Sequence, residues 1–126
     1  MKSVCFLHIG TEKTGTTTIQ NFLSKNRPGL EQQGILYPQS PGNQNHTALA
    51  VYALSEGKQN GLSLSSGISN AEQVPPFRER LSLALDEEIA ASDASIIIFS
   101  NEHLSSRLWT DIEIERVKKL CDKYAE

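Results

Sequence analysis

The sequence predicts an α/β domain of three layers, in which helices cover both faces of a short parallel sheet. Two runs, Ser3–Ile9 and Ser95–Ser100, are almost continuously apolar, which is typical of strands that are covered on both faces. Segments with helical periodicity lie between and after these runs, so strands and helices alternate along the chain. With 126 residues, the chain is long enough for one such domain and too short for two.

The first predicted strand, Ser3–Ile9, leads through a polar loop into a helix. Its continuous hydrophobicity predicts a central position in the sheet, and the loop Gly10–Gly15 follows it. A helix is expected from about Thr16, because apolar residues then recur at positions i, i+3 and i+4. The sequence Arg-Pro-Gly at 27–29 is expected to end this helix. The apolar residues of its stripe are Ile19, Phe22 and Leu23.

The middle of the chain predicts a second strand, a helix and an insertion. A short strand is expected over Gly34–Pro38, followed by a turn-rich loop and then by a helix over His46–Leu54. Residues Ser55–Asn70 contain five serines, three glycines and two asparagines, so they offer little apolar surface to offset the entropy of ordering. We expect a flexible insertion over 55–70.

Two more helices flank the strand Ser95–Ser100. The first is expected to begin with Pro75 and Pro76 in its first turn and to run to about Ser92, and the second to be capped by Asp111. The residues expected to face inward are Phe77, Leu81, Leu85 and Ile89 in the first helix, and Ile114, Val117, Cys121 and Tyr124 in the second.

Composition excludes several classes of function. Twelve basic against fifteen acidic residues give a net charge of −3 without a basic run, so we expect no nucleic-acid partner. The apolar runs are far shorter than the roughly 20 residues of a membrane span, and no signal peptide is recognisable, so a cytoplasmic location without a membrane partner is expected. Cys5 and Cys121 lie far apart without metal-binding spacing, which predicts free thiols and no zinc site.

Three polar loops leave the carboxyl ends of the predicted strands, where parallel sheets bind their ligands. They are Gly10–Gly15, Pro38–His46 and Asn101–Ser106. The first keeps the GxxxxG frame of a phosphate-binding P-loop between a strand and a helix, and the amides at the helix start suit a phosphate. In nucleotide-hydrolysing P-loops a lysine follows the second glycine, whereas here the lysine is Lys13, which disfavours metal-assisted ATP hydrolysis.

The segment HIGTEKTGTTTIQNFL resembles the 5′-phosphosulfate loop of sulfotransferases that use 3′-phosphoadenosine 5′-phosphosulfate (PAPS), because its lysine is displaced in the same way. The resemblance continues more loosely through GILYP, NHTALA and IIIFSNEHL and so spans most of the chain. It implies a P-loop fold, PAPS as cofactor without a metal, and Lys13 near the bridging oxygen that leaves. The implied binding residues are Lys13, Thr14, Gly15, Thr16, Thr17 and Thr18.

The resemblance also implies that the chain is the N-terminal part of a single, longer domain. Sulfotransferases bind the 3′-phosphate through an Arg and a Ser, on and after a strand that follows the helix where this sequence ends at Glu126. Residues 1–126 are therefore expected to lack the 3′-phosphate site. An apolar strand edge such as Ile96–Phe99 is then expected to be open and to favour self-association.

Sulfuryl transfer also needs a base for the acceptor proton. His46 is a candidate because the pKa of histidine lies near working pH, and Glu102 because it follows the third predicted strand. Related sulfotransferases place a His or Glu base in comparable loops. His103 is a weaker candidate, His8 is interpreted as an interior histidine, and Trp109 as a packing anchor.

The function that follows is transfer of a sulfuryl group from PAPS to a hydroxyl or amine acceptor that the sequence does not identify. Two alternatives stay open. One is a P-loop nucleotide kinase or NTPase with a displaced lysine, and the other is an inactive module that binds anions or another protein.

Overall fold

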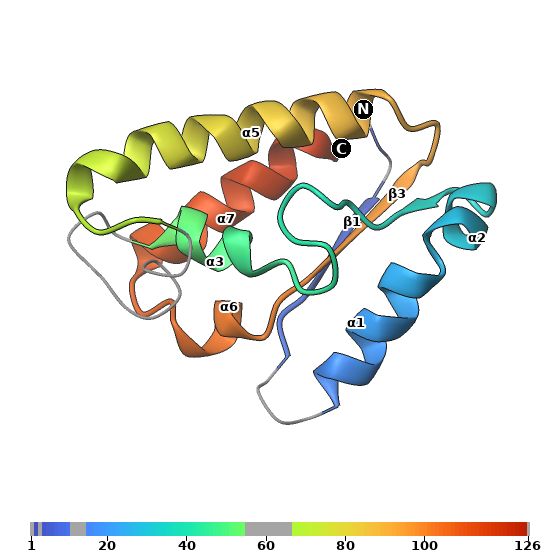
Figure 1. Ribbon diagram of the computed structural model, residues 1–126, viewed down its shortest axis with the longest axis horizontal. Coiled ribbons are helices and arrows are strands. Elements are labelled where there is room, and N and C mark those ends of the chain that lie inside the picture. Colours follow the sequence, from blue (N-terminus) through green and yellow to red (C-terminus); the bar gives the residue numbers. More distant parts are fainter. Residues whose placement is uncertain (1, 3, 11–14, 55–66, 126) are drawn as a thin grey trace.

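Three parallel strands form the sheet of the computed structural model, which describes residues 2, 4–10, 15–54 and 67–125 (Figure 1). They are β1 (Val4–His8), β2 (Ile35–Leu36) and β3 (Ile96–Ser100), in the spatial order β1-β3-β2. About 57% of the described residues are helical. The predicted α/β class and the parallel sheet are confirmed.

The position predicted for the first strand is wrong, because β1 lies at the edge of the described sheet and β3 at its centre. β3 pairs with β1 along its whole length, from Val4 opposite Ile96 to His8 opposite Ser100. Alternate side chains of β1 differ in burial: Phe6 is 56% exposed, whereas Leu7 packs against the core. Continuous hydrophobicity alone therefore did not distinguish a strand covered on both faces from an edge strand.

The helix after β1 begins where the sequence predicts it. Helix α1 spans Thr16–Lys25, and after Asn26 a second helix, α2, spans Arg27–Gln32. Pro28 lies in the first turn of α2, where its missing N–H is not needed. The Arg-Pro-Gly sequence thus ends α1 as expected, but it also starts a new helix.

Two further predicted helices are confirmed. Helix α3 spans Thr47–Ala53, and α5 spans Val74–Ala90 after a short 3-10 turn, η1 (Ala71–Gln73). The buried residues of α5 include Leu81, Leu85 and Ile89, as the spacing of four predicts.

Most of the predicted insertion, residues 55–66, lies outside the described part of the chain. Its last four residues are described and are anchored to the rest of the protein. Ile68 is buried and clusters with Val51 and Val74. The side chain of Asn70 accepts a hydrogen bond from the amide of Glu72 at 3.0 Å and so caps η1.

The last two helices are α6 (His103–Ser106) and α7 (Asp111–Tyr124). Thr110, not Asp111, is the N-cap of α7: its hydroxyl accepts from the amide of Glu113 at 3.2 Å, and the Glu113 carboxylate accepts from the Thr110 amide at 3.2 Å. This reciprocal capping box satisfies two helix-end donors, which explains why Glu113 is buried.

Two side chains near α7 differ from expectation. Trp109 is 76% exposed, so it is not a packing anchor, although its indole N–H donates to the Ser106 carbonyl at 3.3 Å. Ile114 is mostly exposed, whereas Val117, Leu120 and Tyr124 are buried.

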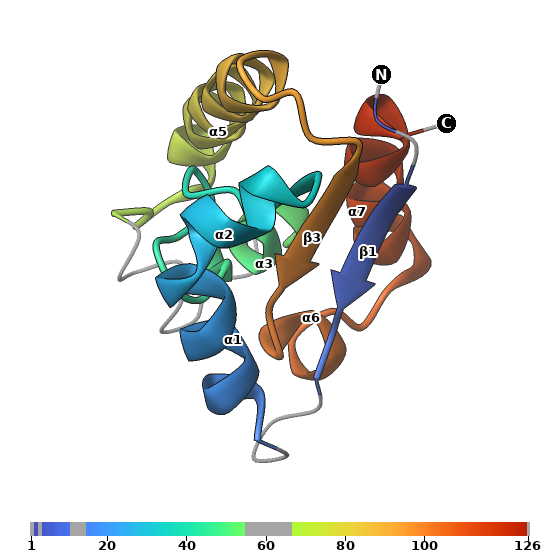
Figure 2. The same ribbon diagram turned by 90° about the vertical axis from the view of Figure 1, so that its right-hand side faces the viewer.

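The main core lies on one face of the sheet. Ile97 and Phe99 of β3 are fully buried there among apolar residues of α3, α5 and α7. The strands run between these three helices on one side and α1 with α2 on the other, an arrangement compatible with three layers (Figures 1 and 2). In the described part of the chain, no helix is long and apolar enough to span a membrane.

Candidate functional site

The carboxyl ends of β1 and β3 lie side by side, as strand pairing of His8 with Ser100 requires. Helix α1 packs against the same end, because Gln20 donates to the Ser100 hydroxyl at 3.2 Å and to Glu102 Oε2 at 2.9 Å. The middle of α1, the end of β3 and the segment after β3 therefore meet at the edge of the sheet where parallel sheets bind ligands.

Two glycines bracket the predicted phosphate loop between β1 and α1. Gly10 and Gly15 have φ values of 94° and 84°, in the left-handed region that glycine adopts without a steric penalty. Lys13 and Thr14 lie between them, outside the described residues.

The first turn of α1 carries the other residues of the predicted loop. The amides of Thr18 and Ile19 donate to the Gly15 carbonyl at 3.2 and 3.4 Å, so the helix begins directly after this glycine. The amides before them have no intrahelical acceptor and point out of the helix start, where the helix dipole favours an anion. Thr17 and Thr18 are exposed and Thr16 is buried, so two threonine side chains are accessible at this end.

Glu102 is the best positioned carboxylate of the site. Asn45 Nδ2 donates to both of its oxygens, at 3.0 and 3.1 Å, and Gln20 donates to Oε2. Burial raises the pKa of Glu102, but hydrogen bonds to the charged form, foremost from Gln20, outweigh it and leave the pKa lowered. The side chain is 15% exposed, and His103 Nε2 lies 3.9 Å from Oε1. Glu102 is thus an oriented, ionised and partly accessible group at neutral pH.

Buried polar side chains connect Glu102 to the strands. The Ser100 hydroxyl lies 2.8 Å from His8 Nδ1, which agrees with the interpretation of His8 as a satisfied interior histidine. Asn101 donates to Asn45 Oδ1 at 2.6 Å, while its own buried Oδ1 has no hydrogen-bond partner among the described residues.

Four polar residues of the site, Gln20, Asn45, Ser100 and Asn101, were not predicted from the sequence. The apolar stripe predicted for α1 is wrong in part, because Ile19 is 42% and Phe22 59% exposed, while the buried residues of this helix are Thr16, Gln20 and Leu23. Because two of these three are polar, apolar periodicity does not indicate the buried face of α1. Asn45, Ser100 and Asn101 lie at a strand end or in loops, where the sequence pattern does not distinguish buried from exposed polar residues. Their role in the site is visible only from their tertiary contacts.

His46 is fully buried, and both ring nitrogens are used. Nδ1 accepts from the Ser100 amide at 3.1 Å, so the proton sits on Nε2, which lies 2.6 Å from the Pro38 carbonyl. The ring stacks on Tyr37 with centroids 4.2 Å apart. Burial lowers the pKa of His46 to about 4. This geometry argues against His46 as the base, because no ring nitrogen is left for an acceptor.

No family model, curated protein or solved structure matches this chain. Across residues 2, 4–10, 15–54 and 67–125, no group of three or more His, Cys, Asp or Glu side chains is placed to hold a metal ion.

Proposed function

We propose that this chain is part of a PAPS-dependent sulfotransferase and carries its 5′-phosphosulfate loop and its base. The observation that supports this most is the pair of left-handed glycines, Gly10 and Gly15, around a loop that ends at the start of α1, with the Glu102 carboxylate held at the same edge of the sheet. An anion site and a proton acceptor close to it are the two elements that sulfuryl transfer requires.

On the donor side, the first-turn amides of α1 and the threonines Thr16–Thr18 bind the phosphosulfate, together with Lys13 and Thr14 of the loop. Lys13 stabilises the negative charge that grows on the bridging oxygen as its bond to sulfur breaks. The helix amides and this lysine supply positive charge, so the proposed reaction needs no metal ion.

On the acceptor side, Glu102 takes the proton of the attacking hydroxyl or amine. A bond forms between the acceptor atom and sulfur, the bond from sulfur to the phosphate oxygen breaks, and 3′-phosphoadenosine 5′-phosphate leaves. Gln20 and Asn45 position the carboxylate through their hydrogen bonds to its oxygens. Because these bonds also lower its pKa, proximity rather than basicity provides the catalysis.

The proposal includes a P-loop domain that continues after this sequence. Ala125 forms a parallel bridge with Lys2, whose amide donates to the Tyr124 carbonyl at 3.0 Å. The backbone thus leaves α7 beside β1 and in the parallel direction, which supports a further strand next to β1. Reading the gene beyond the codon for Glu126 tests this: a following strand and helix with Arg and Ser is expected.

Nucleotide binding separates this proposal from its alternatives. Calorimetry on the 126-residue chain, without Mg²⁺, is expected to show binding of PAPS and of adenosine 5′-phosphosulfate with similar affinity, because the proposed site contacts only the 5′ group. Binding of ATP that requires Mg²⁺ would favour a kinase or NTPase. Absence of binding to all three nucleotides would favour an inactive module that binds another protein.

A pair of lysine variants checks that binding occurs at the proposed loop. Lys13→Ala is expected to weaken PAPS binding about tenfold or more, since a charge-assisted phosphate contact contributes about 1.5–3 kcal/mol. Lys25→Ala, at the opposite end of α1, removes the same charge from an exposed position and should leave the affinity unchanged. Equal effects of the two variants would contradict a specific role of Lys13.

A further inference from the structure

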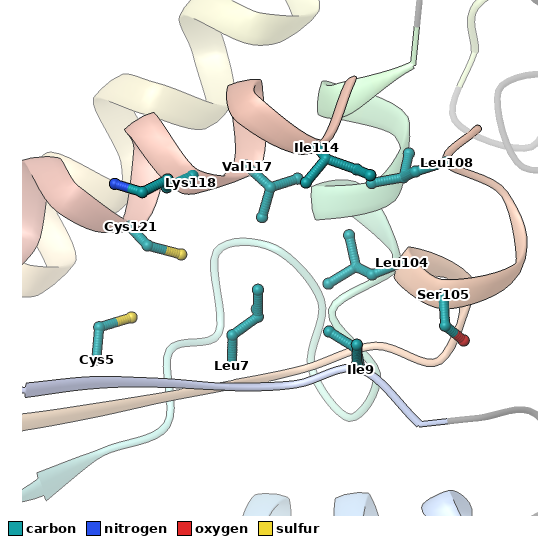
Figure 3. A pocket seen from close by; sticks show the side chains of 10 residues that line it. All are labelled: Cys5, Leu7, Ile9, Leu104, Ser105, Leu108, Ile114, Val117, Lys118 and Cys121. Carbon is teal, nitrogen blue, oxygen red and sulfur yellow. The ribbon is translucent and has the colours of Figure 1, made fainter. Parts of the chain in front are cut away.

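Two cysteines from opposite ends of the chain lie together between β1 and α7. Cys5 is on the strand and Cys121 on the helix, and Figure 3 shows both side chains at the same end of one pocket, with their sulfur atoms directed into it. Both thiols are free and half-buried, and both side chains pack against the main core. The sequence predicted free thiols but gave no reason to place them in contact.

The backbone around the two cysteines holds them in this position. The Lys2 amide donates to the Tyr124 carbonyl at 3.0 Å, three residues from each cysteine, and Ala125 bridges Lys2 in the parallel direction. Cys5 is itself fixed by strand pairing with Ile97. A disulfide needs its two Cα atoms within about 7 Å, and the fixed strand and helix limit how far the two cysteines can separate.

The pair is also open to small molecules. Cys5 and Cys121 line one end of an apolar cavity of about 510 Å³, whose walls include Leu7, Leu104 and Val117. Figure 3 shows Ser105 at the other end of this cavity, away from the two sulfurs. A reagent the size of a short peptide can therefore approach the thiols without unfolding of α7.

We propose that Cys5 and Cys121 form a reversible disulfide by exchange with low-molecular-weight disulfides such as oxidised glutathione. This modification site is independent of the proposed sulfuryl transfer, since it uses none of the residues of that site. The resulting bond joins the first strand of the chain to its last described helix.

The two thiols have different roles in this exchange. Interaction between the two thiols raises the pKa of Cys5 and lowers that of Cys121, while burial raises the pKa of both. Both thiols line the cavity, and in the proposed exchange Cys121, the thiol of lower pKa, attacks first and Cys5 resolves the mixed disulfide.

In the first step, the Cys121 thiolate attacks one sulfur of the small disulfide. A new S–S bond forms, the original S–S bond breaks, and one thiolate leaves and takes up a proton. Cys5 then loses its proton to water and attacks the Cys121 sulfur, releasing the second small thiol. Two electrons pass from the cysteine sulfurs to the small disulfide, which is reduced to two thiols.

The test uses the full chain, reduced and freed of reductant, and incubated with oxidised glutathione at mildly alkaline pH. Intact mass is expected to fall by two hydrogens, and a non-reducing peptide map to show Cys5 linked to Cys121. Dithiothreitol should restore the original mass. A final product that carries glutathione on one or both cysteines, a disulfide-linked dimer, or a chain that reacts only after denaturation would each overturn the proposal.

Two serine variants assign the roles of the cysteines. Cys5→Ser should stop at one glutathione on Cys121, because the resolving thiol is missing. In Cys121→Ser, Cys5 should react with oxidised glutathione at least about tenfold more slowly than Cys121 does in Cys5→Ser, as expected for a thiol of raised pKa. Faster reaction of Cys5 than of Cys121 would overturn the assignment, and the peptide map of the unaltered chain keeps the disulfide testable if a variant does not fold.

Discussion

At the scale of single residues, His46 and Glu102 show how position decides chemistry. Both were candidate bases, and both lie near the carboxyl end of β3. His46 is enclosed, with Nδ1 bonded to the Ser100 amide and Nε2 to the Pro38 carbonyl, while Glu102 remains partly accessible. Of these two side chains, only that of Glu102 is accessible to a ligand, whereas both nitrogens of the imidazole are occupied by backbone groups.

Replacing Glu102 by Gln keeps the shape of the side chain and removes its charge. In a protein that transfers sulfate from PAPS, Glu102→Gln is expected to lower kcat by about 10²–10⁴ and to leave the affinity for PAPS near normal. A transfer assay over a panel of phenols and amines, with calorimetry for PAPS, measures both. Glu115→Gln, which removes the same charge from an exposed position on α7, is the matched control. Full turnover in Glu102→Gln would remove this carboxylate from the mechanism.

Protonation of His46 is expected to make stability depend on pH. Its pKa of about 4 in the folded protein lies below the ordinary 6.5, so the unfolded chain binds the proton more tightly. Neutral His46 contributes about 2–3 kcal/mol to the free energy of unfolding. This contribution is fully present above about pH 6.5 and is lost as the pH falls toward 4. Urea titrations at several pH values measure it, and His46→Gln should flatten the dependence. An NMR titration that places the pKa of His46 near 6.5 would contradict the prediction.

At the scale of elements, the ends of the helices are determined by local contacts that the sequence only partly reveals. Helix α1 starts after Gly15, as its left-handed φ and the following threonines predict. At α7, the sequence predicted Asp111 as the cap, but the structure places Thr110 at the N-cap and Asp111 inside the first turn. The buried carboxylate of Glu113 completes that cap.

Two alanine variants distinguish the cap from its neighbour. Thr110→Ala removes the hydroxyl that accepts from the Glu113 amide and is expected to lower the free energy of unfolding by about 1 kcal/mol. Asp111→Ala loses only the favourable interaction of an exposed charge with the helix dipole, about 0.3–0.5 kcal/mol. Chemical denaturation of both variants gives the comparison. A larger loss for Asp111→Ala would mean that the capping box does not form in solution.

At the scale of the whole molecule, the sheet is unevenly covered. The face with Ile97 and Phe99 packs against α3, α5 and α7, while Val4 and Phe6 on the other face of β1 are exposed. The edge expected to be open was that of Ile96–Phe99, but β3 has a strand on each side, and within the described ranges it is β1 that has only one neighbouring strand. Exposed apolar side chains on such an edge favour association with another chain.

Self-association of the 126-residue chain is therefore expected through β1. Sedimentation velocity over a range of concentrations should show larger species, and Phe6→Glu should shift them toward monomer by placing a charge on the exposed face. Leu83→Glu on α5 is a close control, because both side chains are 56% exposed. Association through β1 would be ruled out if the chain were monomeric at every concentration, or if the two variants had equal effects.

The sequence by itself determined the order of the three strands and of the longer helices, and the two glycines that bracket the segment between β1 and α1, but it did not predict α6. Apolar periodicity, Pro75 and Pro76 at the start of α5, and the glycines at 10 and 15 act within a few residues, so they can be recognised without knowing the fold. Only the tertiary structure decided which strand is central. It also decided the hydrogen-bond partners of the His46 nitrogens and of the Glu102 carboxylate oxygens. These properties depend on partners 50 to 90 residues away, such as Ser100 for His46 and Gln20 for Glu102, and local sequence carries no information about them.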